Sequence, residues 1–99
     1  VARELDMVRV KGRIEPVRMY EILGAAGARE RWQPVIDEFE RGLAAYRNCR
    51  WVDAIESFER VEAANPGDGP AALYIERCRA FAAQPPPPDW DAVTVMDTK

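Results

Sequence analysis

The chain has 99 residues, of which 47% are hydrophobic and 31% are charged, and its formal net charge is −3. This length accommodates one small domain, or pieces of two, with a core of modest size. The absence of histidine excludes histidine general-base catalysis and histidine-ligated zinc, and two cysteines are too few for a Cys₄ zinc site. An acidic chain without a dense basic stripe is unsuited to nucleic-acid binding.

The first segment, residues 5–23, has the pattern of a β-hairpin. Glycine at position 12 is free to take positive φ, so residues 11–13 are expected to form the turn. Pro16 lacks a backbone donor, which places it at a strand start or an edge. A lone hairpin is marginal in water, so this one needs the helical part or another chain to cover it. Alternation in the first strand places Leu5, Met7 and Arg9 on one face and Asp6, Val8 and Val10 on the other.

Residues 25–33 read as a linker, and a helical unit is expected over residues 34–84. Pro34 suits the first position of a helix. Apolar residues then recur at three- and four-residue steps, which is the pattern of helices that bury one face. The stripe of the first helix is Ile36, Phe39, Leu43 and Tyr46, that of the second is Ala54, Ile55, Phe58 and Val61, and that of the third is Tyr74, Ile75, Cys78, Phe81 and Ala82.

The segment 65–70 predicts a stop and a restart between the second and third helices, with Asp68 or Gly69 as the N-cap. Four prolines at positions 85–88 end the third helix and form a stiff spacer. Residues 90–96 favour one more strand. The expected fold class is therefore α+β and mainly α, with an N-terminal hairpin in residues 1–24, a three-helix unit, and a Pro-rich segment with a short C-terminal strand in residues 85–99.

The run from Leu5 to Gly24 resembles the last hairpin of the catalytic domain of class III adenylate and guanylate cyclases. Those domains end on the form VKGK-x-x-P-V-x-x-Y-E-V, and the matching residues here are Val10, Lys11, Gly12, Pro16, Val17 and Tyr20, with Arg13 where a second lysine is usual. The resemblance implies that Lys11 contacts the nucleotide triphosphate in the parent protein, which a point charge on a long stem suits. The alternative is a solvated turn lysine.

The middle of the chain resembles a tetratricopeptide repeat through Gly42, Trp51, Ala54, Phe58 and Pro66. The resemblance implies that a small residue lets two helices approach, that aromatic rings fill the gap between them, and that the proline breaks the second helix. The pattern departs from the family in the first helix, where Arg41 takes a usual leucine position and Ala45 a usual aromatic one. Since such repeats normally need about three copies, this is expected to be a degenerate or capping unit.

Together the two resemblances suggest the C-terminal tail of a bacterial multidomain cyclase, and the start at Val1 suggests a piece of a longer chain. They imply a non-catalytic interaction or regulatory segment whose parent, a phosphorus–oxygen lyase, converts ATP or GTP with Mg²⁺. The metal-binding aspartates of that family lie upstream, so this segment is expected to be inactive, without a catalytic or metal site or a cofactor of its own. The expected partners are the upstream catalytic domain and a second copy, as a homodimer.

Two other functions remain open: a free-standing tetratricopeptide-like scaffold that binds a peptide, and a plain packing module. No apolar run approaches the roughly 18 residues of a membrane span, and no signal-peptide pattern is present. The segment is therefore expected to be cytoplasmic and without direct membrane contact, although the parent itself could be membrane-anchored. Cys49 and Cys78 are expected to be free thiols.

Several further residues allow two interpretations each. Glu56, Glu59 and Glu62 could serve a metal or acid–base role, but a solvated helix face is the simpler interpretation. Residues 85–88 could bind an aromatic groove instead of acting as a spacer. Trp90, which lies between two aspartates, could anchor in a neighbouring surface.

Overall fold

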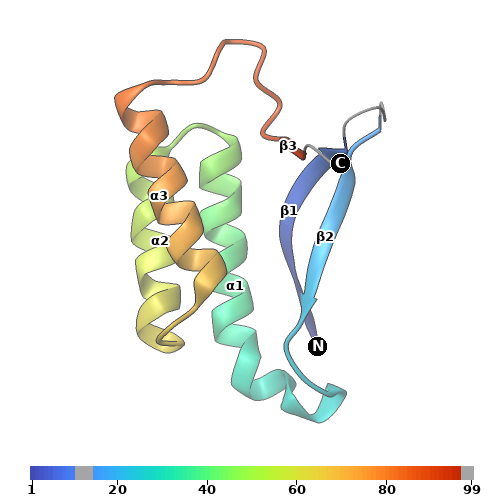
Figure 1. Cartoon of the computed structure of the whole chain (residues 1–99). Coiled ribbons are helices and arrows are strands. Elements are labelled where there is room, and N and C mark those ends of the chain that lie inside the picture. The colour runs from blue at the N-terminus through green and yellow to red at the C-terminus, as the bar shows by residue number, and fades with distance from the viewer. Residues whose placement is uncertain (11–14, 97–99) are drawn as a thin grey trace.

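The computed structural model describes residues 1–10 and 15–96. It consists of a three-stranded sheet on one side and three helices on the other (Figure 1). The elements in chain order are β1 (Ala2–Val10), β2 (Val17–Ile22), a short 3₁₀ helix (Ala26–Ala28), α1 (Arg29–Arg47), α2 (Trp51–Ala64), α3 (Gly69–Ala83) and β3 (Thr94–Met96). The expected α+β, mainly α class, with an N-terminal hairpin and three helices, is confirmed.

The sheet has the order β2-β1-β3, so β1 is its central strand. β2 pairs with β1 in antiparallel fashion, and β3 pairs in parallel with residues 8–10 at the far end of β1 from the N-terminus (Figure 1). The register between β1 and β2 shifts between Glu4 and Asp6, as at a β-bulge. Regular alternation predicts that Leu5 and Val8 lie on opposite faces of the first strand. In the structure Leu5 packs against the core and Val8 is also buried, because this irregularity shifts the alternation.

The core lies between the three helices and is rich in aromatic rings. Phe39, Phe58 and Tyr74 are almost fully buried, and their rings touch in pairs at centroid separations of 5.0–5.8 Å. Leu43 is buried with them, and Trp51 packs against the cluster while remaining partly exposed. Most residues of the predicted apolar stripes are therefore buried, whereas Ile55 and Phe81 are partly buried and Ala82 is exposed.

α1 begins at Arg29 and includes Pro34, so the expected linker over residues 25–33 and the start at Pro34 are wrong. Residues 29–33 include arginine, glutamate and glutamine, which are good helix formers. Trp32 gives this extra turn an anchor, because its side chain packs against the core. Proline near the start of a helix removes only one backbone hydrogen bond, and the anchored turn tolerates that loss.

The turn between α2 and α3 follows the sequence expectation closely. Asp68 is the N-cap of α3, and its carboxylate accepts a hydrogen bond of 3.0 Å from the backbone N–H of Ala71. Pro70 lies in the first turn of the helix. Gly67 has a φ of +84°, a conformation that side chains other than glycine rarely adopt.

After α3 the Pro-rich segment crosses the end of the helical layer and returns to the sheet (Figure 1). Trp90, which the sequence offered as an anchor for a neighbouring surface, packs on this chain's own helices. Its ring lies 5.3 Å from that of Tyr46, 5.7 Å from that of Trp51 and 5.1 Å from that of Phe81. This contact fixes the place from which the chain enters β3.

Replacement of Phe58 by alanine tests this core. Phe58 has 0% exposure and contacts both Phe39 and Tyr74, so its removal leaves a cavity that fixed rings cannot fill. We expect Phe58→Ala to lower the free energy of unfolding by about 3–5 kcal/mol in urea denaturation. Val52→Ala, at a position that is 68% exposed on the same helix, is the control and should change stability little. A loss below about 1 kcal/mol for Phe58→Ala would contradict this helix packing.

Candidate interaction surface

The hairpin turn that carries Lys11, with Gly12 and Arg13, lies outside the described residues. The structure describes the two strands that flank it, β1 up to Val10 and β2 from Val17. The triphosphate contact of Lys11 therefore stays a prediction from the family resemblance.

The five positions of the repeat-like motif lie along α1, α2 and the turn that follows. A Cβ atom at Gly42 would lie 2.7 Å from the ring of Phe58, so only glycine permits this close approach of the two helices. Ala54 is fully buried, Trp51 is partly buried, and Pro66 is exposed in the turn after α2. The geometry agrees with the packing roles assigned to them. It does not by itself identify a repeat family.

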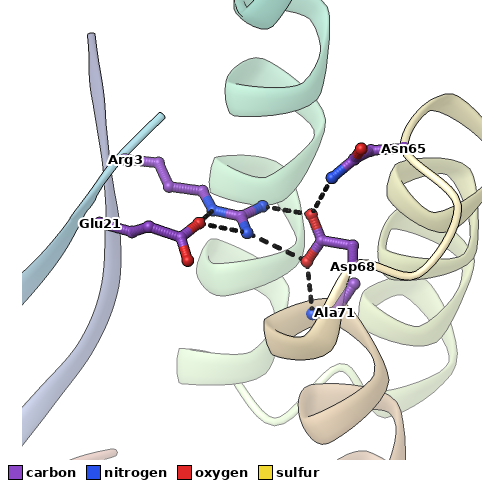
Figure 2. Close-up of polar contacts among 5 residues, drawn as sticks. All are labelled: Arg3, Glu21, Asn65, Asp68 and Ala71. Atoms are coloured by element: carbon purple, nitrogen blue, oxygen red, sulfur yellow. Dashed lines mark hydrogen bonds and ion pairs between the residues drawn. The ribbon is translucent and has the colours of Figure 1, made fainter. Parts of the chain in front are cut away.

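A buried ion cluster fastens the sheet to the helices (Figure 2). The Arg3 guanidinium, on β1, donates to both carboxylate oxygens of Asp68 at 2.8 and 3.1 Å. It also donates to Glu21 on β2 at 2.8 Å and lies 4.6 Å from the centre of the Phe39 ring. The side chains of Arg3 and Asp68 are only 2% and 0% exposed. Arg3 thus joins both strands of the hairpin to α1 and to the start of α3.

A second set of contacts joins β1 to the middle of α3. The Asp6 carboxylate accepts hydrogen bonds of 2.9 Å from Arg77 on α3 and from the Thr94 hydroxyl on β3. The Tyr74 hydroxyl donates to the backbone carbonyl of Leu5 at 2.6 Å. Burial and the nearby Asp6 charge raise the pKa of Tyr74, so this hydroxyl keeps its proton and remains a donor.

The sequence reasoning missed these contacts, although it named Asp68 as a cap. Nothing in the sequence pattern places the hairpin against the helices, and in the structure side chains of β1 and of the α3 region hold it there. Arg3 and Asp68 are 65 positions apart, and an arginine near the start of a strand carries no local signal of burial. The one signal in the sequence was that an isolated hairpin is marginal in water and needs another part of the protein to pack against it.

An apolar groove opens between the sheet and α3. Its volume is about 300 Å³. Its lining comes from all three strands and from α3: Leu5, Asp6, Val8, Met19, Gly69, Pro70, Leu73, Tyr74, Arg77 and Thr94. Met19 and Leu73 remain 41% and 46% exposed at its mouth. The helices cover β1 well but leave β2 largely uncovered.

Neither cysteine nor the glutamates of α2 form a chemical site. Burial raises the pKa of the Cys78 thiol to about 11, so it is protonated at neutral pH, and Cys49 is exposed and free. Glu56 and Glu59 are exposed, and Glu62 is partly buried. Among residues 1–10 and 15–96, no three histidine, cysteine or acidic side chains are placed to hold a metal ion. The described residues therefore do not fit the Mg²⁺ that the family resemblance implies for the parent.

Comparison with known proteins gives one informative similarity. No family model matches the chain, and no solved structure matches it. The chain is 29% identical over 80 residues to the "adenylate cyclase, terminal-differentiation specific" of Dictyostelium discoideum. That alignment covers 79% of this chain but 4% of the cyclase. The chain is thus related to a small region of a much longer adenylate cyclase, and the expected bacterial origin and repeat family remain predictions.

The length of the alignment shows which part of the chain is shared. An alignment over 79% of 99 residues leaves about 21 residues outside it, so it includes residues 22–78 wherever it begins. This range contains α1, α2 and most of α3. The alignment with the cyclase therefore extends over the helical unit and is not confined to the hairpin. Within the described part of the chain, no helix is both long and apolar enough to cross a membrane.

The ion cluster predicts a strong and coupled loss of stability on mutation. Arg3→Met leaves Asp68 buried without its cation, and we expect it to cost about 3–5 kcal/mol of unfolding free energy in urea denaturation. Asp68→Asn keeps a capping oxygen but loses the charge. The double variant should cost less than the sum of the two single changes, because neither charge is then left alone. Additive losses would show that the two side chains do not interact.

The same cluster predicts acid sensitivity. Burial alone would raise the pKa of Asp68, but hydrogen bonds from Arg3, Asn65 and the Ala71 amide outweigh it and hold the pKa below its usual range. A carboxyl group with a lowered pKa stabilises the fold above its unfolded pKa of about 4, and this contribution is lost as pH falls through the folded value. Stability measured from pH 7 to pH 2 should therefore fall steeply below about pH 4. The Arg3→Met/Asp68→Asn variant should show a shallower decline; an unchanged slope would contradict the assignment.

Proposed function

We propose that this chain is a non-catalytic C-terminal interaction and regulatory segment of a class III nucleotide cyclase. In this proposal the parent protein converts ATP or GTP to the cyclic nucleotide with Mg²⁺ bound by upstream residues. The partner of the segment is the upstream catalytic domain, on the cytoplasmic side. The observation that carries the proposal is the similarity to an adenylate cyclase across the helical unit.

The contacts between the layers give this proposal a physical basis. β1, which leads into the turn with Lys11, is tied to α3 through Arg3 with Asp68 and through Asp6 with Arg77. These ion pairs are buried or partly buried, so they hold more firmly than exposed pairs do. A partner that binds or shifts the helices would therefore also shift β1. Regulation in this proposal means that the helical unit sets the position of the hairpin.

Two chains test the proposal: the 99-residue chain and the longer protein in which it occurs. The 99-residue chain should form no cyclic nucleotide from ATP or GTP with Mg²⁺ or Mn²⁺, because it lacks the upstream aspartates of the family. The longer protein should form it, and Lys11→Ala should lower its turnover roughly ten- to hundredfold through loss of a phosphate contact. Cyclic nucleotide made by the pure 99-residue chain would overturn the non-catalytic assignment.

The regulatory part needs its own comparison. Removal of residues 25–99 from the longer protein keeps the hairpin and Lys11 but deletes the helical unit. We expect this change to alter the rate or the assembly of the catalytic domain several-fold, measured over a range of protein concentrations. An unchanged rate and an unchanged mass at every concentration would contradict a regulatory role. If further helical repeats take the place of a catalytic domain upstream, the scaffold function is favoured instead.

A further inference from the structure

The segment of residues 85–96, which we call the strap, lies over one end of the helical layer. It leaves α3 through four prolines, crosses that end and pairs with β1 (Figure 1). The prolines cannot continue α3, and they form a stiff connection instead of a flexible one. The strap therefore reaches the sheet as a separate segment that depends on its contacts with the helices and with β1.

The strap is anchored by the ring of Trp90. This ring contacts one aromatic side chain from each helix, namely Tyr46 near the end of α1, Trp51 at the start of α2 and Phe81 near the end of α3. The rings of Trp51 and Phe81 are themselves stacked, with centroids 5.1 Å apart. Tyr46, Trp51 and Phe81 thus form an aromatic platform under the strap. Tryptophan offers a large apolar area and a specific ring geometry, so it is well suited to anchor a peptide on such a platform.

Backbone pairing and two polar contacts complete the attachment. β3 pairs in parallel with residues 8–10 of β1. The Asp91 carboxylate accepts a hydrogen bond of 3.2 Å from Arg9. The Thr94 hydroxyl donates to Asp6 at 2.9 Å. Strand addition to a sheet edge, combined with side-chain anchors, is a recurring way in which proteins bind short peptides. The strap occupies its surface in this manner.

The strap is held less firmly than the hairpin. The side chains of Arg9 and Asp91 are 33% and 49% exposed, so their ion pair stabilises the strap little. Asp6 keeps its ion pair with α3 when the Thr94 hydroxyl leaves. Ala92 is buried but has a φ of +62°, which is unfavourable for a residue with a side chain and opposes docking. Release of the strap therefore leaves the buried ion cluster intact.

We propose that the aromatic platform and the edge of β1 at residues 8–10 form a peptide-binding surface, which the strap occupies in cis and vacates when it opens. The partner that fits the vacated surface is a peptide with the chemistry of the strap: prolines, then a tryptophan between two carboxylates, then a short strand. Prolines restrict such a peptide before it binds, so less conformational entropy is lost. The short connection to α3 gives the strap an effective concentration on the order of 1 mM, which closes the surface to weak competitors. This inference does not depend on whether the parent protein is a cyclase.

Calorimetric titration of the 99-residue chain with a synthetic peptide of residues 85–96 tests the surface. Trp90→Ala removes the anchor of the strap, so this variant should bind the peptide at least tenfold more tightly than the unchanged chain, whose own strap competes. Val52→Ala, at an exposed position of α2, is the control and should bind like the unchanged chain. A peptide that carries the Trp90→Ala change should bind the variant at least tenfold more weakly. Equal binding by the Trp90→Ala variant and the unchanged chain, or binding by neither, would overturn the proposal.

Hydrogen exchange tests whether the strap opens on its own. In the unchanged chain the amides of β3 should exchange at least tenfold faster than those in the middle of α2, because local opening costs less free energy than global unfolding. Trp90→Ala should speed exchange in β3 and in residues 8–10 at least tenfold, while the amides of residues 54–61 stay protected. Equal acceleration in α2, or an unfolded variant, would show that the strap is an integral part of the core and would overturn the proposal.

Discussion

A guanidinium group lies between the sheet and the helices, and the placement of the two layers depends on how its charge is balanced. Burial of an ion costs several kcal/mol unless its partners have good geometry. Arg3 meets this condition through Asp68 and Glu21, and the ring of Phe39 covers its face. These partners belong to three different elements, so a shift of any one of them exposes or unpairs a buried charge. Local packing within the helices would not impose such a restriction on the sheet.

Whether a feature could be predicted from the sequence depends on how far apart in the chain the residues that determine it lie. The hairpin, the three helices and the cap at Asp68 depend on neighbours within a few residues, and they were predictable. The start of α1 was misplaced because Pro34 was taken as a boundary, whereas tertiary contact of Trp32 supports an earlier start. The Arg3 cluster could not be predicted, since its strongest pair spans 65 positions and depends on the packing of β1 against α3. The same holds for the groove, which requires the placement of both layers.

For the proposed function, the way in which the helices hold the hairpin matters more than the hairpin or the helices alone. A flexible linkage would let the helical unit move without any effect on the strands. The ion pairs from Arg3 and Asp6 instead connect β1 to both the start and the middle of α3, and Trp90 fixes the return of the chain toward β3. Because the alignment with the adenylate cyclase includes the helices, the shared part is the one that restrains the strands.

The uncovered surface of β2 follows from the same geometry. The helical layer is drawn toward β1, since Arg3, Asp6 and Leu5 all contact it there. Those contacts leave α3 beside β1, so Leu73 and Met19 border an open groove and the outer edge of β2 receives no strand from the described part of the chain. Movement of α3 toward β2 would cover these apolar groups, but it would separate Arg77 from Asp6 and Arg3 from Asp68. Since unpairing a buried ion costs more than exposure of a partly covered methionine or leucine, the chain keeps its ion pairs, and the described residues leave β2 largely uncovered.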